Sequence, residues 1–189
     1  MENHSRIIYG KNGYSEEWVK EASRRGLPNI KTSIEAISKF DLDKNVSLLT
    51  RNGIYTIEEL QARKNVLVEQ YISTIMLEAK TLLNMVDGYI VPAMADDIKK
   101  YKDIASVSKY AETRMNRLTT LLDELEVAFD ELKESIHNDY ETTTEIDRGL
   151  AISKNVVPLI NKLRGYADEC EKLSTEETYP LPTYSKMLY

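Results

Sequence analysis

The chain has 189 residues, of which 42% are apolar and 30% charged, with a formal net charge of −6 and a sequence pI of about 5.1. This length is sufficient for one domain with its own core. A net acidic chain lacks the clustered Lys and Arg that phosphate contacts require, so we expect neither nucleic acid nor an anionic membrane surface as a partner. The low content of Gly (7) and Pro (5) favours a few long elements over many short strands.

The chain contains one cysteine, Cys170, so it cannot form an intramolecular disulfide. This usage is typical of a reducing, cytoplasmic compartment. No stretch approaches the roughly 20 apolar residues of a membrane-spanning helix, and the first residues do not resemble a signal peptide. Because no His or CxxC pattern surrounds Cys170, we interpret it as a small buried hydrophobe.

Residues 1–55 form the irregular part, which we interpret as a connector with short helices. The apolar run at residues 7–9 precedes a Gly-containing turn and predicts a strand whose partner sheet lies elsewhere, because an isolated strand is not stable. Ser15 predicts the N-cap of a short helix that ends at residues 26–28. Thr32 and Glu35 predict a capping box for a second short helix, and a third is expected to end at Gly53.

Residues 56–178 predict a bundle of long helices. Thr56 and Glu59 form a capping-box pattern, and three stretches then repeat apolar residues at alternating spacings of four and three. The first stretch comprises Val68, Ile72, Ile75, Ala79, Leu82, Val86, Tyr89 and Ala93. The second comprises Ala111, Met115, Leu118, Leu122, Leu125, Phe129, Leu132 and Ile136. The third comprises Ile152, Val156, Leu159, Leu163, Tyr166, Cys170 and Leu173.

The fold expected from these stretches is all-α: an antiparallel bundle of three long helices with shorter N-terminal helices and an extended, Pro-containing C-terminal arm. Short links near residues 103–107 and 138–143, with stop and start signals at residues 138–139 and 142–144, place neighbouring helices antiparallel. The first helix is expected to run from about residue 57 to 102. Pro92 and Pro158 lie inside the apolar patterns and are expected to kink their helices.

Residues 179–189 differ from the bundle because their prolines disfavour helix and favour an extended arm. The arm is rich in Tyr and Leu, whereas disordered tails are normally poor in aromatic residues, so we expect it to dock rather than fray. The candidate docking residues are Tyr179, Pro180, Leu181, Pro182, Tyr184 and Leu188. Trp18, the only tryptophan, is a further candidate for an interface because it more often anchors a core or an interface than a ligand.

Catalytic motifs were not found: the sequence has no phosphate-binding Gly-rich loop and no HExxH. Glu134 and His137 have the ExxH spacing of di-iron bundles, but such a site needs a second ExxH, and the other histidine, His4, lies outside the helices. We therefore interpret His137 as a cation at a helix C-terminus. Two charged clusters are interpreted as solvated helix faces rather than metal or phosphate sites; they comprise Asp123, Glu124, Glu126, Asp130, Glu131 and Glu134, and Lys20, Arg24 and Arg25.

Several segments together resemble a known family. Residues 12–22 (NGYSEEWVKEA) and 25–29 (RGLPN) are similar to the segment that follows the catalytic core in type III glutamine synthetases. Residues 53–60 (GIYTIEEL) and 69–72 (EQYI) also fit that family. Residues 179–184 (YPLPTY) resemble its ending, in which Trp often replaces Tyr179. The resemblance extends over nearly the whole chain from about Ile7.

The resemblance implies an ATP- and Mg-dependent ligase that joins ammonia to glutamate and assembles as two stacked hexameric rings. The catalytic residues of the family lie upstream of this segment, so no catalytic, cofactor-binding or metal-binding residue is assigned to this chain. We expect the chain to be the C-terminal helical domain of such an enzyme, with a role in structure and assembly and no catalysis of its own. Its expected partners are the rest of the synthetase chain and neighbouring subunits of a homo-oligomer.

Two other functions remain open at this point. A free-standing helical adaptor that binds partner proteins would also have long apolar seams. A metal-dependent bundle enzyme would need the ExxH unit at Glu134 and His137 to bind iron or zinc.

Overall fold

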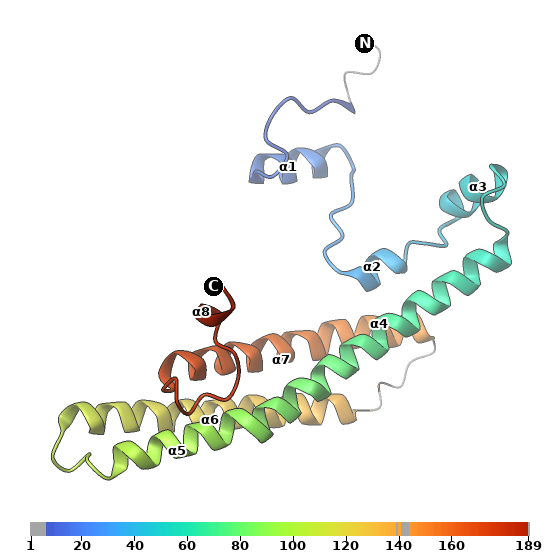
Figure 1. Cartoon of the computed structure of the whole chain (residues 1–189). Helices are drawn as coiled ribbons and strands as arrows, with labels where there is room; N and C mark the ends of the chain where they lie inside the picture. Colours follow the sequence, from blue (N-terminus) through green and yellow to red (C-terminus); the bar gives the residue numbers. More distant parts are fainter. Residues whose placement is uncertain (1–6, 139, 141–143, 189) are drawn as a thin grey trace.

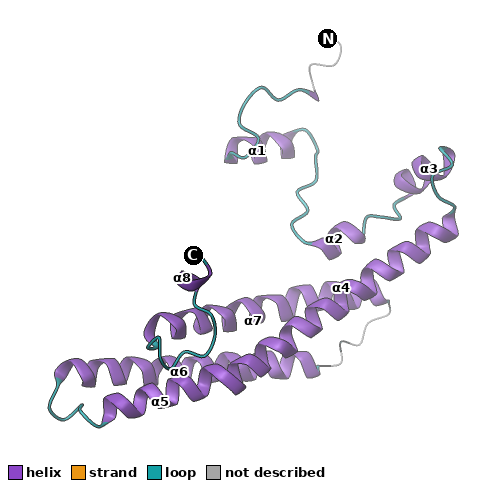
Figure 2. Cartoon of the chain, viewed as in Figure 1, coloured by secondary structure: helices purple, strands orange, loops and turns teal. Residues whose placement is uncertain are grey.

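The computed structural model describes residues 7–138, 140 and 144–188, and it is all-α, as predicted. Figures 1 and 2 show only helices and loops in this described part. Three short helices, α1 (Glu16–Arg24), α2 (Ser33–Ile37) and α3 (Asp43–Arg51), precede the bundle. The remaining elements are α4 (Ile57–Met85), the π-helix η2 (Val86–Ile90), α5 (Val91–Lys102), α6 (Lys109–His137), α7 (Glu145–Leu173) and α8 (Tyr184–Met187).

The long helices form the predicted antiparallel bundle. α4, η2 and α5 follow one another as a single rod, and α6 and α7 run back and forth beside it (Figure 1). α6 packs on α5 and α7, and α7 also packs on α4. The link from α5 to α6 lies where it was expected, whereas the predicted turn signals at residues 139, 142 and 143 fall outside the described residues.

Side-chain caps define where the long helices begin. The Thr56 hydroxyl accepts a hydrogen bond from the Glu59 amide at 3.2 Å, and the Glu59 carboxyl accepts one from the Thr56 amide at 2.8 Å. This is the predicted capping box of α4, which satisfies two amides that the first turn leaves without a helical partner. Ser108 and Thr144 cap α6 and α7 through single side-chain acceptors.

Short helices α1 and α3 end at glycines with positive φ. Gly26 has φ 74° and Gly53 has φ 65°, in the left-handed region that glycine enters without steric cost. The amide of Leu27 bonds the Ala22 carbonyl at 2.9 Å, and that of Ile54 bonds the Leu49 carbonyl at 3.0 Å. Both helices therefore end in a Schellman motif at the positions predicted from the sequence.

Pro92 changes the phase of the first apolar seam. Because proline has no amide hydrogen and its ring clashes with the carbonyl four residues earlier, the preceding turn widens into the π-helix η2. The sequence pattern placed Tyr89 in the seam, and that prediction is wrong: Tyr89 is 53% exposed and Ile90 is 3% exposed. Pro158, in contrast, lies inside α7 without dividing it.

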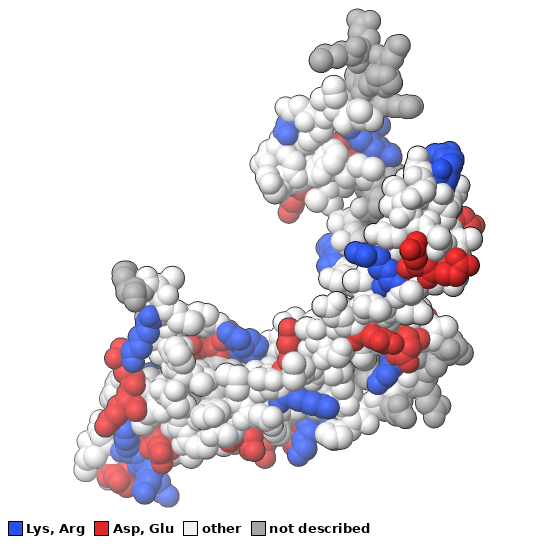
Figure 3. All heavy atoms as spheres, turned by 45° about the vertical axis from the view of Figure 1, so that its right-hand side comes forward, with Lys and Arg blue, Asp and Glu red and all other residues white. Residues whose placement is uncertain are grey.

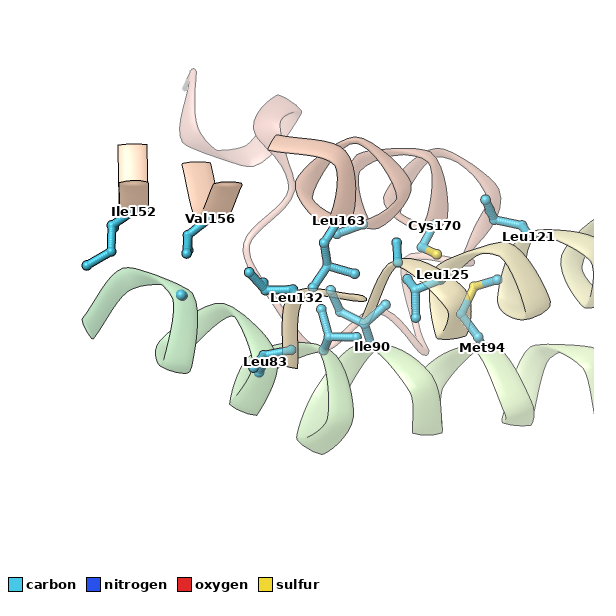
Figure 4. Packing of buried hydrophobic residues seen from close by; sticks show 14 of the residues in the cluster. Leu83, Ile90, Met94, Leu121, Leu125, Leu132, Ile152, Val156, Leu163 and Cys170 are labelled. Carbon is cyan, nitrogen blue, oxygen red and sulfur yellow. The ribbon is translucent and has the colours of Figure 1, made fainter. Parts of the chain in front are cut away.

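The core lies along the line where the long helices meet. Figure 4 shows side chains from α4, η2, α5, α6 and α7 that point toward one another. The buried core residues of this cluster include Val68, Ile72, Ala79, Leu83, Val86, Ile90, Met94, Leu118, Leu121, Leu125, Ala128, Leu132, Ile152, Val156, Leu163, Ala167, Cys170 and Leu173. Burial of each large side chain contributes about 1.5–3 kcal/mol, which makes this seam the main source of stability.

Two sequence predictions about the chain ends are wrong in part. Residues 8–10 have no regular structure, so the strand predicted at residues 7–9 is not formed. A strand needs a paired neighbour to satisfy its backbone groups, and the described residues contain no other strand that could pair with this segment. The arm predicted to be extended contains the single turn α8, which Thr183 caps. Pro180 and Pro182 precede that cap and therefore do not disrupt the turn.

α2 attaches the N-terminal segment to the bundle through Ile34, which is completely buried. Its side chain lies over Gly149 of α7, where a Cβ atom would come within 2.6 Å of Ile34 Cδ1. A side chain at position 149 would force the end of the Ile34 side chain to move away from α7. The space at Gly149 therefore fixes where α2 sits on the bundle.

We predict that Gly149→Ala lowers the free energy of unfolding by about 1–2 kcal/mol, because overpacking at Ile34 exceeds the gain in helix propensity. Gly165→Ala is the matched control in the same helix, since no atom lies within 4 Å of a Cβ added there. That control should raise stability by up to about 1 kcal/mol. Urea unfolding followed by circular dichroism measures both, and equal effects of the two substitutions would contradict the role given to Gly149.

Candidate docking surfaces

Trp18 lies at the centre of an aromatic and cationic cluster on α1. The ring centroids of Trp18 and Tyr9 are 4.4 Å apart, and the Arg25 guanidinium lies 5.7 Å from the Trp18 ring centre and 5.8 Å from that of Tyr9. Arg25 also donates to the Ile8 carbonyl at 3.3 and 3.4 Å. Cation–π contacts of this kind each contribute about 0.5–1 kcal/mol at exposed sites. The cluster holds residues 8–10 against α1.

Glu21 neutralises much of the basic face predicted for α1. Its carboxyl oxygens accept hydrogen bonds from Arg24 at 2.6 and 2.7 Å and from Arg25 at 2.7 Å. Hydrogen bonds from Arg24 and then Arg25 lower the pKa of Glu21 to about 2. Two of the three cations of the face therefore already share a carboxylate, which agrees with its interpretation as a solvated helix face.

The connector exposes more apolar side chains than it buries. Neither α1 nor α3 has a buried residue, and α2 has only Ile34. Half of the exposed large hydrophobic residues among the described ones lie between residues 7 and 57. We call them the connector surface: Ile7, Ile8, Tyr14, Val19, Leu27, Ile30, Leu42, Leu48, Ile54 and Ile57. Figure 3 shows this part of the chain standing above the bundle, with large uncharged areas on the visible face.

The C-terminal arm lies on α7. Tyr179 and Leu181 pack against the core cluster, and burial raises the pKa of the Tyr179 hydroxyl to about 12. The amide of Tyr184 donates to Glu171 at 2.8 Å, and its ring and hydroxyl contact the Arg164 guanidinium. Arg164 also pairs with Asp168 at 2.8 Å.

Between α4, α7 and the arm lies an open groove of about 590 Å³. It is lined mainly by apolar side chains, including Leu77, Leu82, Met85, Ile90, Ile160, Ala167, Tyr179, Leu181, Pro182, Tyr184 and Met187. The structure thus brings Tyr179, Leu181, Pro182 and Tyr184 together. Pro180 and Leu188, the other two candidate residues of the arm, are exposed, and Trp18 belongs to the separate cluster on α1.

Asp97 anchors the turn that leads into the arm, a role that the sequence analysis did not assign. The side chain is completely buried, and its carboxyl group accepts hydrogen bonds from the Thr175 amide at 3.0 Å and from the hydroxyls of Thr175 and Thr178 at 3.2 and 2.8 Å. We call this set of bonds the Asp97 clasp.

The spacing read from the sequence places Asp96, three residues after Ala93, in the apolar seam. Asp97 joins the seam only because the buried positions shift at η2 to Ile90 and Met94.

The polar groups considered for chemistry occupy structural positions. His137 ends α6, and its Nδ1 lies 2.6 Å from the Lys133 carbonyl oxygen. Cys170 is buried, and burial raises the pKa of its thiol to about 12. Over the described ranges 7–138, 140 and 144–188, no three His, Cys, Asp or Glu side chains form a group able to hold a metal. None of the helices described is both long and apolar enough to cross a membrane.

Comparison with known proteins agrees with the resemblance seen in the sequence. A family model described as the glutamine synthetase C-terminal domain matches residues 1–109, more than half of the chain. The chain belongs to this family. The match covers the connector, α4 and α5, and it ends where α6 begins.

Relatives of this glutamine synthetase C-terminal domain extend the likeness to the rest of the chain. A glutamine synthetase of Butyrivibrio fibrisolvens is 29% identical over 195 residues, covering 98% of this chain and 28% of that protein. The type-3 glutamine synthetase of Dictyostelium discoideum is 24% identical over 98% of this chain and 27% of its own length. A glutamine synthetase of Bacteroides fragilis is 26% identical over 97% of this chain. The chain spans less than a third of each of these relatives.

We predict that Asp97→Ala destabilises the domain by about 2–4 kcal/mol, because it removes the buried carboxylate that accepts from the Thr175 amide and from two half-buried hydroxyls. Its neighbour Asp96 is exposed, so Asp96→Ala should change stability by no more than about 0.5 kcal/mol. Chemical unfolding of both variants measures the difference. Similar values for the two would mean that the clasp does not stabilise the fold.

Deleting residues 179–189 should remove about 2–4 kcal/mol of stability, from the partial burial of Tyr179 and Leu181. For a chain of this size, each kcal/mol corresponds to about 2–4 °C in melting temperature. The control is a deletion of residues 185–189, which keeps the contacts of Tyr184 and removes the exposed Met187 and Leu188. An unchanged melting temperature for the longer deletion would show that the arm contributes nothing.

Proposed function

We propose that this chain is the structural C-terminal domain of a glutamine synthetase and that it does not catalyse on its own. The observation that carries the proposal is the family match, together with relatives named glutamine synthetase that align with 97–98% of this chain but only 27–28% of their own length. The parent enzyme would be an ATP-dependent glutamate–ammonia ligase that uses Mg²⁺. Its substrates and cofactors would bind in the remainder of the synthetase.

The role of the domain in this proposal is assembly. Several of its charged side chains make contacts within the domain. Asp97 holds the turn after α7, Glu21 pairs with two arginines, and Arg164 contacts the arm. Its apolar connector surface and the groove beside the arm offer contact areas for the rest of the synthetase and for neighbouring subunits of a homo-oligomer. We propose a cytoplasmic location, because the single cysteine suits a reducing compartment.

We expect the purified chain to form no glutamine from glutamate, ammonia, ATP and Mg²⁺ above a blank without protein. An active glutamine synthetase assayed in parallel shows that the conditions support turnover, and circular dichroism shows that the chain is folded. Glutamine formation that increases in proportion to the concentration of this chain would overturn the proposal. An adaptor would also be inactive, so the reading frame upstream of Met1 is sequenced as well. The proposed function predicts that it encodes the rest of a synthetase.

A further inference from the structure

We infer that the connector surface is a docking site for the catalytic part of the same polypeptide. This inference rests on the proposed function and assigns the connector surface to one occupant, the catalytic part of the same polypeptide, rather than to a neighbouring subunit. The contact would be intramolecular, between residues 7–57 and the portion of the synthetase that lies outside this domain.

The first argument is that α1 and α3 have well-defined ends but no core. Ser15 accepts a hydrogen bond from the Trp18 amide, and Gly26 and Gly53 close α1 and α3 with Schellman motifs. Each helix nevertheless has nine residues and no buried side chain. Isolated helices of this length are marginal in water, because helical stability in proteins comes mainly from packing of an apolar face. The stabilising component that α1 and α3 lack is therefore burial of apolar side chains.

The second argument is the amount of apolar surface that these short helices expose. Val19 on α1 and Leu48 on α3 are 51% and 50% exposed, and Leu27 and Ile54 in the loops that follow these helices are similarly open. Residues 7–57 hold half of the exposed large hydrophobic residues of the described chain, and apolar exposure at this density marks interaction sites more often than single exposed residues do. The bundle, in contrast, buries a continuous seam along all of its long helices.

The third argument identifies the occupant. More than two thirds of each relative lies outside the part that aligns with this chain, so a large body of the same polypeptide accompanies the domain in those proteins. Residues 8–10 lie on α1, held by Arg25 and the Tyr9–Trp18 contact. Chain that precedes them in a synthetase is tethered beside the connector surface. A short tether gives an effective concentration in the millimolar range, which favours an intramolecular contact over one between copies.

The test uses the complete synthetase chain that carries this domain, with the photo-crosslinking residue p-benzoylphenylalanine in place of Val19 or, separately, Leu48. Both positions are half exposed in the domain, so replacement does not disturb its core. The matched control carries the same residue at Val127 on α6, which is 57% exposed and outside the connector. Illumination, denaturing gels and mass spectrometry of the products follow.

We expect positions 19 and 48 to give about tenfold more cross-linked product than position 127, because a docked partner is held at high local concentration. The product should run at monomer mass and contain peptides from the catalytic part. Products of dimer mass would assign the surface to another copy, and yields no higher than at position 127 would show an open surface. Either result overturns the inference. Glutamine synthesis by the unmodified complete chain tests the proposed function separately, since its absence would refute that function whatever the cross-links show.

Discussion

An amphipathic helix of about thirty residues is stable in water only if its apolar stripe is covered, and three such helices in this chain cover one another. The seam where α4, α6 and α7 meet determines the antiparallel order, the lengths of the helices and the position of nearly every buried side chain. Other features depend on it. α2 is attached because Ile34 reaches the seam beside Gly149, and the arm is attached because Tyr179 and Leu181 pack against its side.

The short helices of the connector depend on their end caps rather than on a buried apolar stripe. These helices are specified by their ends, through Ser15, Thr32, Gly26 and Gly53, and by short-range contacts such as that of Trp18 with Tyr9. These contacts determine local geometry but bury little area. The bundle thus has a buried core of its own, whereas α1 and α3 of the connector have defined ends but no buried side chains. Because the relatives contain a further large part outside this domain, that part is the partner that we infer for the exposed helices of the connector.

The features predicted correctly from the sequence are those determined by neighbours in the chain. Caps at Ser15 and Thr56 and left-handed ends at Gly26 and Gly53 depend on residues three to five positions apart, and the heptad pattern depends on a period read along one helix. The hydrogen bonds between Tyr184 and α7 could not be predicted this way, because they join residues 13 to 20 positions apart. The same limit hid the Asp97 clasp, whose partners lie 78 and 81 residues away.

The single thiol of the chain has a practical consequence. Cys170 is buried in the seam, so reagents cannot reach it in the folded bundle. Burial also raises the pKa of its thiol to about 12, so little of the thiolate that reagents attack is present. Labelling under native conditions therefore requires a local opening that exposes the thiol, and its rate reports the free energy of that opening when closing is faster than labelling. Cys170 thus serves as a natural reporter of local opening in the bundle, and no engineered cysteine is needed.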